Sequence, residues 1–166
     1  MAKEEFSDGI ALLKADHRKV EELFERFESA RSGSKQKIAQ EICDELKIHT
    51  IIEEQIFYPA LEGKIDDDLL NEAYVEHDAA KILVNDIMSG NPDDEFYDAK
   101  VKTLSEEIAH HIEEEESGKD GMFAQARKAE VDLVALRDLM LERKRELMEQ
   151  AKAEGLPPAE LKVVNA

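Results

Sequence analysis

Hydrophobic residues recur along this chain at steps of three and four, which is the spacing of amphipathic helices, and the alternation typical of strands is absent. The pattern predicts a first helix that is capped by Ser7 or Asp8 and ends near Ala30, and further helices over residues 34–62, 66–89, 92–116 and 122–153. Four long helices with short connections favour an all-α, up-down-up-down antiparallel four-helix bundle. With the additional C-terminal helix, we predict one domain over residues 1–154 and a tail over residues 155–166.

Histidines interrupt the apolar stripes of the four bundle helices. Four of the five histidines lie on these stripes, one on each helix: His17, His49, His77 and His111. Each sequence gap between them is about one helix plus one turn, so the four side chains are expected at one depth of the bundle. Glu53 and Glu115 follow two of the histidines by four residues and therefore share their helix face.

Burying these six polar groups together is costly unless something pairs them. A single histidine on an apolar stripe is more often a hydrogen-bonded core residue, and this is the alternative for each one taken alone. Four imidazoles with two carboxylates instead suit iron, manganese or zinc. We therefore predict a metal site, with no separate catalytic or other cofactor-binding residues. Its predicted ligands are His17, His49, Glu53, His77, His111 and Glu115.

The fifth histidine, His110, has polar helical neighbours, so we interpret it as exposed or as an outer neighbour of the site. A π-bulge in this helix would reverse the choice and turn His110 and Glu114 inward in place of His111 and Glu115. Exposure is likewise the default for Glu54 and Glu116, and Lys81 is interpreted as a solvated or snorkelling side chain. For Tyr58, Tyr74 and Tyr97 we favour amphipathic core positions, and a position near the metal is the alternative.

Charge limits the partners of this chain. Asp and Glu outnumber Lys and Arg by 40 to 22, giving a net charge of −18. This balance argues against nucleic acid and against anionic membrane surfaces. A single cysteine, Cys43, and no visible signal peptide or membrane-spanning run predict a cytoplasmic protein. Spare apolar residues on the last helix leave both a monomer and a homodimer open.

The motifs resemble those of the hemerythrin-like (HHE cation-binding) family. The resemblance covers about residues 6–150 and rests on Leu-Lys-Ala-Asp-His17, His49-Thr-Ile-Ile-Glu53-Glu, Phe-Tyr-Pro59-Ala-Leu, Glu-His77-Asp and His-His111-Ile-Glu-Glu-Glu115-Glu. It implies a four-helix bundle with an oxo- or hydroxo-bridged non-heme di-iron centre, held by the six residues named above, with both glutamates bridging. Manganese or zinc is the alternative metal.

Two departures from the family pattern bear on function. Lys81 stands where oxygen-carrying hemerythrins have a further histidine, which puts simple reversible oxygen carriage in doubt. The segment Ser117–Gly121 precedes Met122-Phe123, where relatives often continue directly to a Phe-Pro turn. We expect this segment to break or bulge the fourth helix and to form an entrance to the site.

The resemblance implies a protein that binds dioxygen, peroxide or nitric oxide, in oxygen or redox sensing or in a stress response. One alternative is a di-iron enzyme with peroxide-disproportionating or oxidase activity. Another is a bundle in which metal has only a storage or structural role.

Overall fold

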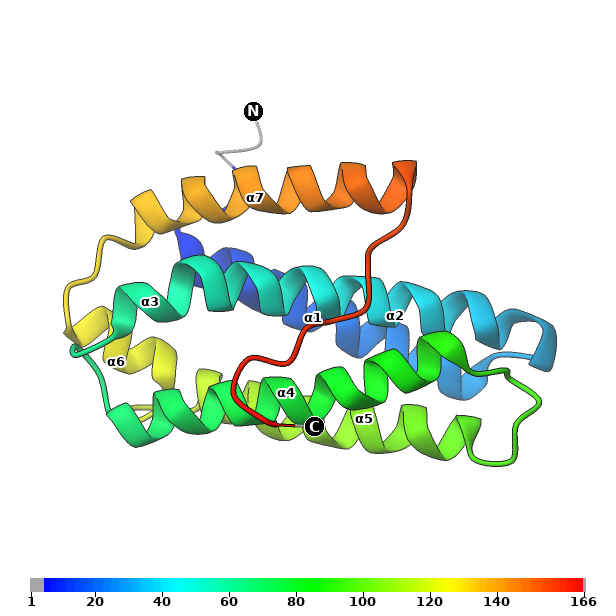
Figure 1. Cartoon of the computed structure of the whole chain (residues 1–166). Coiled ribbons are helices and arrows are strands. Elements are labelled where there is room, and N and C mark those ends of the chain that lie inside the picture. The colour runs from blue at the N-terminus through cyan, green and yellow to red at the C-terminus, as the bar shows by residue number, and fades with distance from the viewer. Residues whose placement is uncertain (1–4, 166) are drawn as a thin grey trace.

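Helices make up the regular structure throughout residues 5–165, the part of the chain that the computed structural model describes. Four of them form an antiparallel bundle (Figure 1): α1 (Gly9–Ser29), α2 (Ser32–Ile52), α4 (Asp67–Ser89) and α5 (Tyr97–Glu116). Helix α1 packs against α2 and α5, and α4 packs against the same two helices. The predicted all-α four-helix bundle is therefore confirmed. None of the helices within residues 5–165 is both long and apolar enough to cross a bilayer.

Aspartate side chains cap the start of three helices, where backbone N–H groups have no partner within the helix. Of the two predicted caps for α1, Asp8 fills the position. The hydrogen bonds run from Ala11 N–H to Asp8, from Asp68 and Leu69 N–H to Asp66, and from Ala135 N–H to Asp132.

Helix α2 continues without a gap into a π-helical turn, η1 (Glu53–Phe57), and then into the short α3 (Tyr58–Leu61). The Tyr58 N–H donates to the carbonyl of Glu53, five residues back. In an α-helix, residues five apart differ by about 140° around the axis, because each residue turns by about 100°. The wider π turn brings Glu53 and Tyr58 onto the same face, and both side chains point into the bundle.

The π turn lies in a different helix from the one considered in the sequence. Helix α5 is α-helical from Tyr97 to Glu116, so nothing shifts the register at His110 and His111. Helix α5 also begins later than the predicted Pro92. Asn91 and Asp94 close a turn there through side-chain bonds to the N–H groups of Asp93 and Asn91, which compete with helix formation.

The predicted helix over residues 122–153 is two helices, α6 (Met122–Lys128) and α7 (Leu133–Ala153). Between them, Glu130 adopts a left-handed backbone with φ of 56°, which ends the first helix. The Asp132 side chain then caps the second. Because of this break, α6 closes one end of the bundle, whereas α7 packs along α1 and α2 (Figure 1).

Two apolar clusters fill the interior, with a polar layer between them. One cluster includes Leu13 and Ile52 and extends to α3, α6 and α7. The other includes Val20 and Leu104 and fills the opposite end of the four-helix bundle. Along α1, His17 lies between Leu13 of the first cluster and Val20 of the second. The predicted level of buried histidines is this layer.

Residues 156–165, which we call the C-terminal strap, run from the end of α7 across α2 to α4 without forming a helix or strand (Figure 1). The strap is bound to α4 at two places. Ala159 and Asn85 exchange two hydrogen bonds, at 2.8 and 2.9 Å. The buried Asp78 carboxylate accepts the N–H groups of residues 162, 163 and 164. Nothing in the polar pattern of the strap indicates this docking.

Candidate metal centre

The structure brings all six predicted metal ligands together in the polar layer, each at most 8% exposed. They come from α1, α2, η1, α4 and α5, and they fall into two groups. His17, His49 and Glu115 form one group, and Glu53, His77 and His111 form the other. Within each group one ligand atom per residue lies within 4.8 Å of the others, close enough to hold a metal ion.

The two glutamates lie between the histidine pairs. Glu53 Oε1 lies 2.7 Å from His49 Nε2 and 3.4 Å from His77 Nε2. Glu115 Oε1 lies 3.3 Å from His17 Nε2 and 3.2 Å from His111 Nε2. Each carboxylate thus contacts one histidine of each pair, which is the position that a bridging ligand requires.

Four further carboxylates hold the outer edges of the histidine rings. Each accepts a hydrogen bond from Nδ1 of one histidine, so that Nε2 is directed to the centre, where it can bind a metal ion in place of a proton. The contacts are His17 with Glu116 at 2.7 Å, His49 with Asp16 at 3.0 Å, His77 with Glu54 at 2.8 Å and His111 with Glu76 at 2.9 Å.

These outer contacts form a closed ring around the bundle. Asp16 of α1 binds the histidine of α2, and Glu54 of η1 binds the histidine of α4. Glu76 of α4 binds the histidine of α5, and Glu116 of α5 binds the histidine of α1. In sequence, each outer carboxylate stands directly beside a predicted ligand, but it orients the ligand of another helix. Every bundle helix therefore fixes the orientation of a ring on its neighbour.

Unsatisfied polar atoms at the centre test whether a cation fits. Among residues 5–165, Nε2 of His17 and His49, both oxygens of Glu53 and Oε1 of Glu115 are buried without a hydrogen-bond partner. The close N···O contacts among them lack the alignment of hydrogen bonds. Buried polar atoms are otherwise nearly always paired. Imidazole nitrogens and carboxylate oxygens are natural metal donors, so the residues present fit a metal ion well.

The local charges favour a cation as well. Burial would lower the pKa of His49, but the carboxylates of Glu53 and Asp16 raise it to about 10. Burial would raise the pKa of Glu115, but His111 and His17 hold it well below its usual value of 4.5. The metal-free site therefore attracts protons at neutral pH, and a metal ion would replace them.

Tyr58 is a member of the site that sequence reasoning placed among core residues. Its hydroxyl donates to Glu115 Oε2 at 3.2 Å and lies 3.1 Å from Nε2 of His77 and 3.2 Å from Nε2 of His111. Burial and the charges of Glu115 and Glu53 raise the pKa of this hydroxyl well above 10, so it keeps its proton. The π turn that aims Tyr58 inward has no clear sequence signal beyond Pro59.

A cavity of about 20 Å³ adjoins the site on the side of the second apolar cluster. Its wall combines His17 and His49 with apolar side chains such as Val20 and Ile108. This volume has room for about one water molecule. On the other side of the site, Phe123 of α6 stacks on the His17 ring, with centroids 5.9 Å apart and planes at 9°.

The segment Ser117–Gly121 folds α6 back onto the end of the bundle. Gly121 permits this turn, because a Cβ there would lie 2.4 Å from the carbonyl oxygen of Ser117. Helix α5 ends at Glu116, so the segment breaks the helix directly beside the site, as one of the two expectations had it, and α5 itself carries no bulge. With Phe123 only 3% exposed, the segment places a packed ring over the site where we expected an entrance.

Glu54, Lys81 and Glu116 lie around the site, although we expected exposure for the two glutamates and a solvated or snorkelling position for Lys81. Glu54 is buried, and it joins His77 to Lys81, whose ammonium lies 2.9 Å from Glu54 Oε1. Glu116 is 17% exposed and joins His17 to an arginine. His110 is 63% exposed, as interpreted from its polar neighbours. The positions of Glu54, Lys81 and Glu116 depend on contacts between helices, which the periodicity of a single helix does not reveal.

The fold and the buried side chains together define a helical bundle with a cation-binding His/Glu centre. The chain belongs to the hemerythrin HHE cation binding domain family, which it matches over residues 8–118, and the family predicted from the motifs is confirmed.

The fold resembles the crystal structure of a hemerythrin HHE cation binding domain-containing protein from Mycobacterium kansasii. The TM-score is 0.76 at 19% sequence identity, covering 91% of this chain and 96% of that one. The chain is also 26% identical over 107 residues to a DNA nickase from Nostoc sp. (strain PCC 7120), a match covering 64% of this chain and 30% of that protein.

Proposed function

We propose that this protein is a non-heme di-iron protein that binds dioxygen, peroxide or nitric oxide, in oxygen or redox sensing or a stress response. In this proposal His17 and His49 hold one ion, His77 and His111 hold the other, and Glu53 and Glu115 bridge them. The observation that carries it is the position of each glutamate oxygen between one histidine of each pair. When bound, the two irons would supply electrons and an open coordination position.

The size of the adjoining cavity supports a ligand of two or three atoms. With about 20 Å³ of space, the wall admits no bulky substrate without rearrangement. Val20, Leu46 and Ile108 make most of this wall apolar, which disfavours the entry of water relative to a diatomic gas. The protein thereby limits both what reaches the centre and how readily charged products leave it.

The alternative function, a peroxide-disproportionating or oxidase enzyme, is favoured by Tyr58. Its hydroxyl lies within hydrogen-bond distance of Glu115 and two histidines and keeps its proton at neutral pH. A group with these contacts can deliver a proton into a site that is closed to bulk water. Glu115 would accept or return that proton along the 3.2 Å hydrogen bond.

The proposal is tested by loading the purified full-length chain with iron(II) without oxygen and measuring bound iron. We expect two ions per chain, and a visible absorption band after admission of dioxygen, peroxide or nitric oxide. The Glu53→Ala variant should lose iron and colour, whereas Glu113→Ala, which removes an exposed carboxylate from α5, should keep both. One tightly bound ion or none in the unaltered chain would rule out the di-iron proposal.

Further measurements separate the alternatives. Oxygen evolution from added peroxide that disappears in Glu53→Ala would favour the enzyme. Full metal occupancy without colour or redox change would favour storage or a structural role, with zinc or manganese as the metal. The nicking activity named for the Nostoc relative is not part of the proposal, because the match spans only 30% of that protein and a net charge of −18 disfavours DNA. We propose a cytoplasmic monomer or homodimer.

A further inference from the structure

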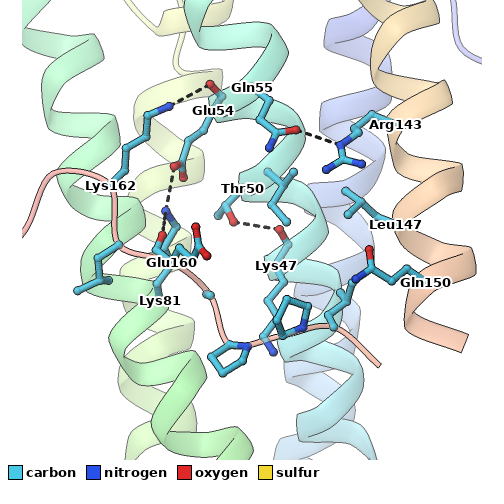
Figure 2. A pocket seen from close by; sticks show the side chains of 16 residues that line it. Lys47, Thr50, Glu54, Gln55, Lys81, Arg143, Leu147, Gln150, Glu160 and Lys162 are labelled. Atoms are coloured by element: carbon cyan, nitrogen blue, oxygen red, sulfur yellow. Dashed lines mark hydrogen bonds and ion pairs between the residues drawn. The ribbon is translucent and has the colours of Figure 1, made fainter. Parts of the chain in front are cut away.

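A second cavity, much larger than the one at the metal centre, lies outside the bundle between α2, α7 and the C-terminal strap (Figure 2). Its volume is about 540 Å³. Pockets for small organic ligands span roughly 300–1,000 Å³. The strap forms one wall, so the cavity exists because residues 156–162 fold back over α2.

The wall of this cavity is positively charged, although the chain as a whole is strongly acidic. Four basic side chains line it: Lys47, Lys81, Arg143 and Lys162. Two acidic residues, Glu54 and Glu160, accompany them. The ammonium of Lys81 and the carboxylate of Glu54 neutralise each other at 2.9 Å, and Arg143 bonds Gln55 and Glu146.

The ammonium of Lys162 donates to the backbone carbonyl of Glu54 at 3.5 Å, which leaves Lys47 as the basic residue of this wall without a hydrogen-bond or ion-pair partner among residues 5–165. The Lys47 side chain is only 4% exposed and is directed toward the strap (Figure 2). Within residues 5–165, no hydrogen bond or ion pair reaches its ammonium. Asp44, one turn earlier in α2, interacts electrostatically with Lys47 at longer range but forms no ion pair with it. The ammonium is not among the fully buried atoms that lack a partner, so it is accessible to solvent in the cavity, where an anion can pair with it.

Apolar side chains supply the rest of the cavity wall. Ile51 and Leu147 face it from α2 and α7, and Leu156 faces it from the strap. Thr50 and Gln150 add neutral polar groups. A purely inorganic ion would leave this apolar surface uncovered, whereas an organic anion with a hydrocarbon body would cover it.

We propose that this cavity binds a small organic carboxylate, with the carboxylate group on Lys47 and the hydrocarbon body against Ile51, Leu147 and Leu156. The cavity does not require the metal centre to be occupied, so this site and the proposed di-iron function stand or fall separately.

The test is isothermal titration calorimetry of the full-length chain with octanoate, with 1-octanol as the uncharged probe of the same length. We expect one octanoate per chain, and octanol bound at least ten-fold more weakly. Lys47→Met should weaken octanoate binding about 10- to 100-fold, the factor for loss of one charge-assisted hydrogen bond. The affinity of Lys47→Arg for octanoate should stay within a few-fold of the affinity of the unaltered chain.

A matched control is Lys152→Met, which removes an exposed charge from α7 outside the cavity and should leave octanoate binding unchanged. Lys47→Met should fold, because no hydrogen bond or ion pair within residues 5–165 is lost with the ammonium and methionine has a similar length. If this variant unfolds nevertheless, the comparison of octanoate with octanol in the unaltered chain decides. Absence of octanoate binding, equal binding of the two probes, or unchanged binding in a folded Lys47→Met protein would each overturn the proposal.

Discussion

Replacing Asp78 by asparagine should release the C-terminal strap from α4. The Asp78 side chain is fully buried, and it accepts the N–H groups of Lys162, Val163 and Val164 at 2.6–2.9 Å. It also lies 3.2 Å from the ammonium of Lys81. Asparagine has nearly the same shape but no charge. Its NH2 group is a hydrogen-bond donor and would face the backbone N–H donors of the strap.

The pKa of Asp78 sets the size of the effect. Burial would raise this pKa, but the backbone N–H groups of Val164, Lys162 and Val163 lower it from 3.8 to about 2. At about 1.4 kcal/mol for each unit of pKa, the folded protein favours the charged carboxylate by about 2 kcal/mol. We expect opening of the strap to become easier by a similar amount, which corresponds to an increase of about 30-fold in the open population.

Hydrogen–deuterium exchange followed by mass spectrometry measures this population directly. In Asp78→Asn, the amides of residues 162–164 should exchange about 30-fold faster than in the unaltered chain, with little change in the middle of α1 and α5. Asp120→Asn, which removes an exposed carboxylate, is the control and should leave strap exchange unchanged. If exchange rises less than three-fold in Asp78→Asn, the carboxylate does not hold the strap and the reasoning is wrong.

Three further predictions concern the metal centre. Glu54→Gln weakens the orientation of His77 and should reduce metal affinity about 10- to 100-fold in competition with a chelator, and an unchanged affinity would contradict the role of the outer carboxylates. The metal-free protein should lose thermal stability as pH rises, because the pKa of His49 is raised to about 10: stability from protonated His49 is fully present below pH 6.5 and is lost through pH 10. Metal affinity should increase over the same pH range, because fewer protons must leave the ligands when the metal binds. A melting temperature of the metal-free protein that rises with pH would refute the predictions for both stability and affinity. Tyr58→Phe should retain metal and fold, and, if the protein is an enzyme, should lower peroxide turnover at least ten-fold; unchanged turnover would exclude proton delivery by the hydroxyl.

The features that the sequence predicted are those that depend on the periodicity of a single helix. The stripes that carry His17, His49, His77 and His111 follow from helical periodicity, and the spacing of four residues placed Glu53 beside His49. These six side chains do converge, because short connections force the helices to run side by side. The same periodicity assigned His110 to the polar face, where it is found.

The remaining features depend on contacts between helices or on backbone geometry. Glu54 and Glu116 were interpreted as exposed because, on their own helices, they lie beside the apolar stripe and not on it. Both are covered by a neighbouring helix that carries a histidine. The inward position of Tyr58 needs a π turn. The docking of the strap needs Asp78, whose carboxylate accepts backbone N–H groups from residues 84 to 86 positions later in the chain. An acidic residue stands directly beside four of the six predicted ligands, and this is the one signal that would have pointed to the outer ring.

The π turn at Glu53–Phe57 makes this chain unequally tolerant of small insertions and deletions. Removing one residue there would convert the turn to an ordinary α-helix and rotate everything after it by about 100°, carrying the tyrosine hydroxyl out of the site while leaving every histidine on its helix. The six converging His and Glu side chains and the inward position of Tyr58 can therefore be lost independently in evolution. Relatives that keep all six ligand positions but lack the extra residue would be expected to bind metal and to differ in what they do with it.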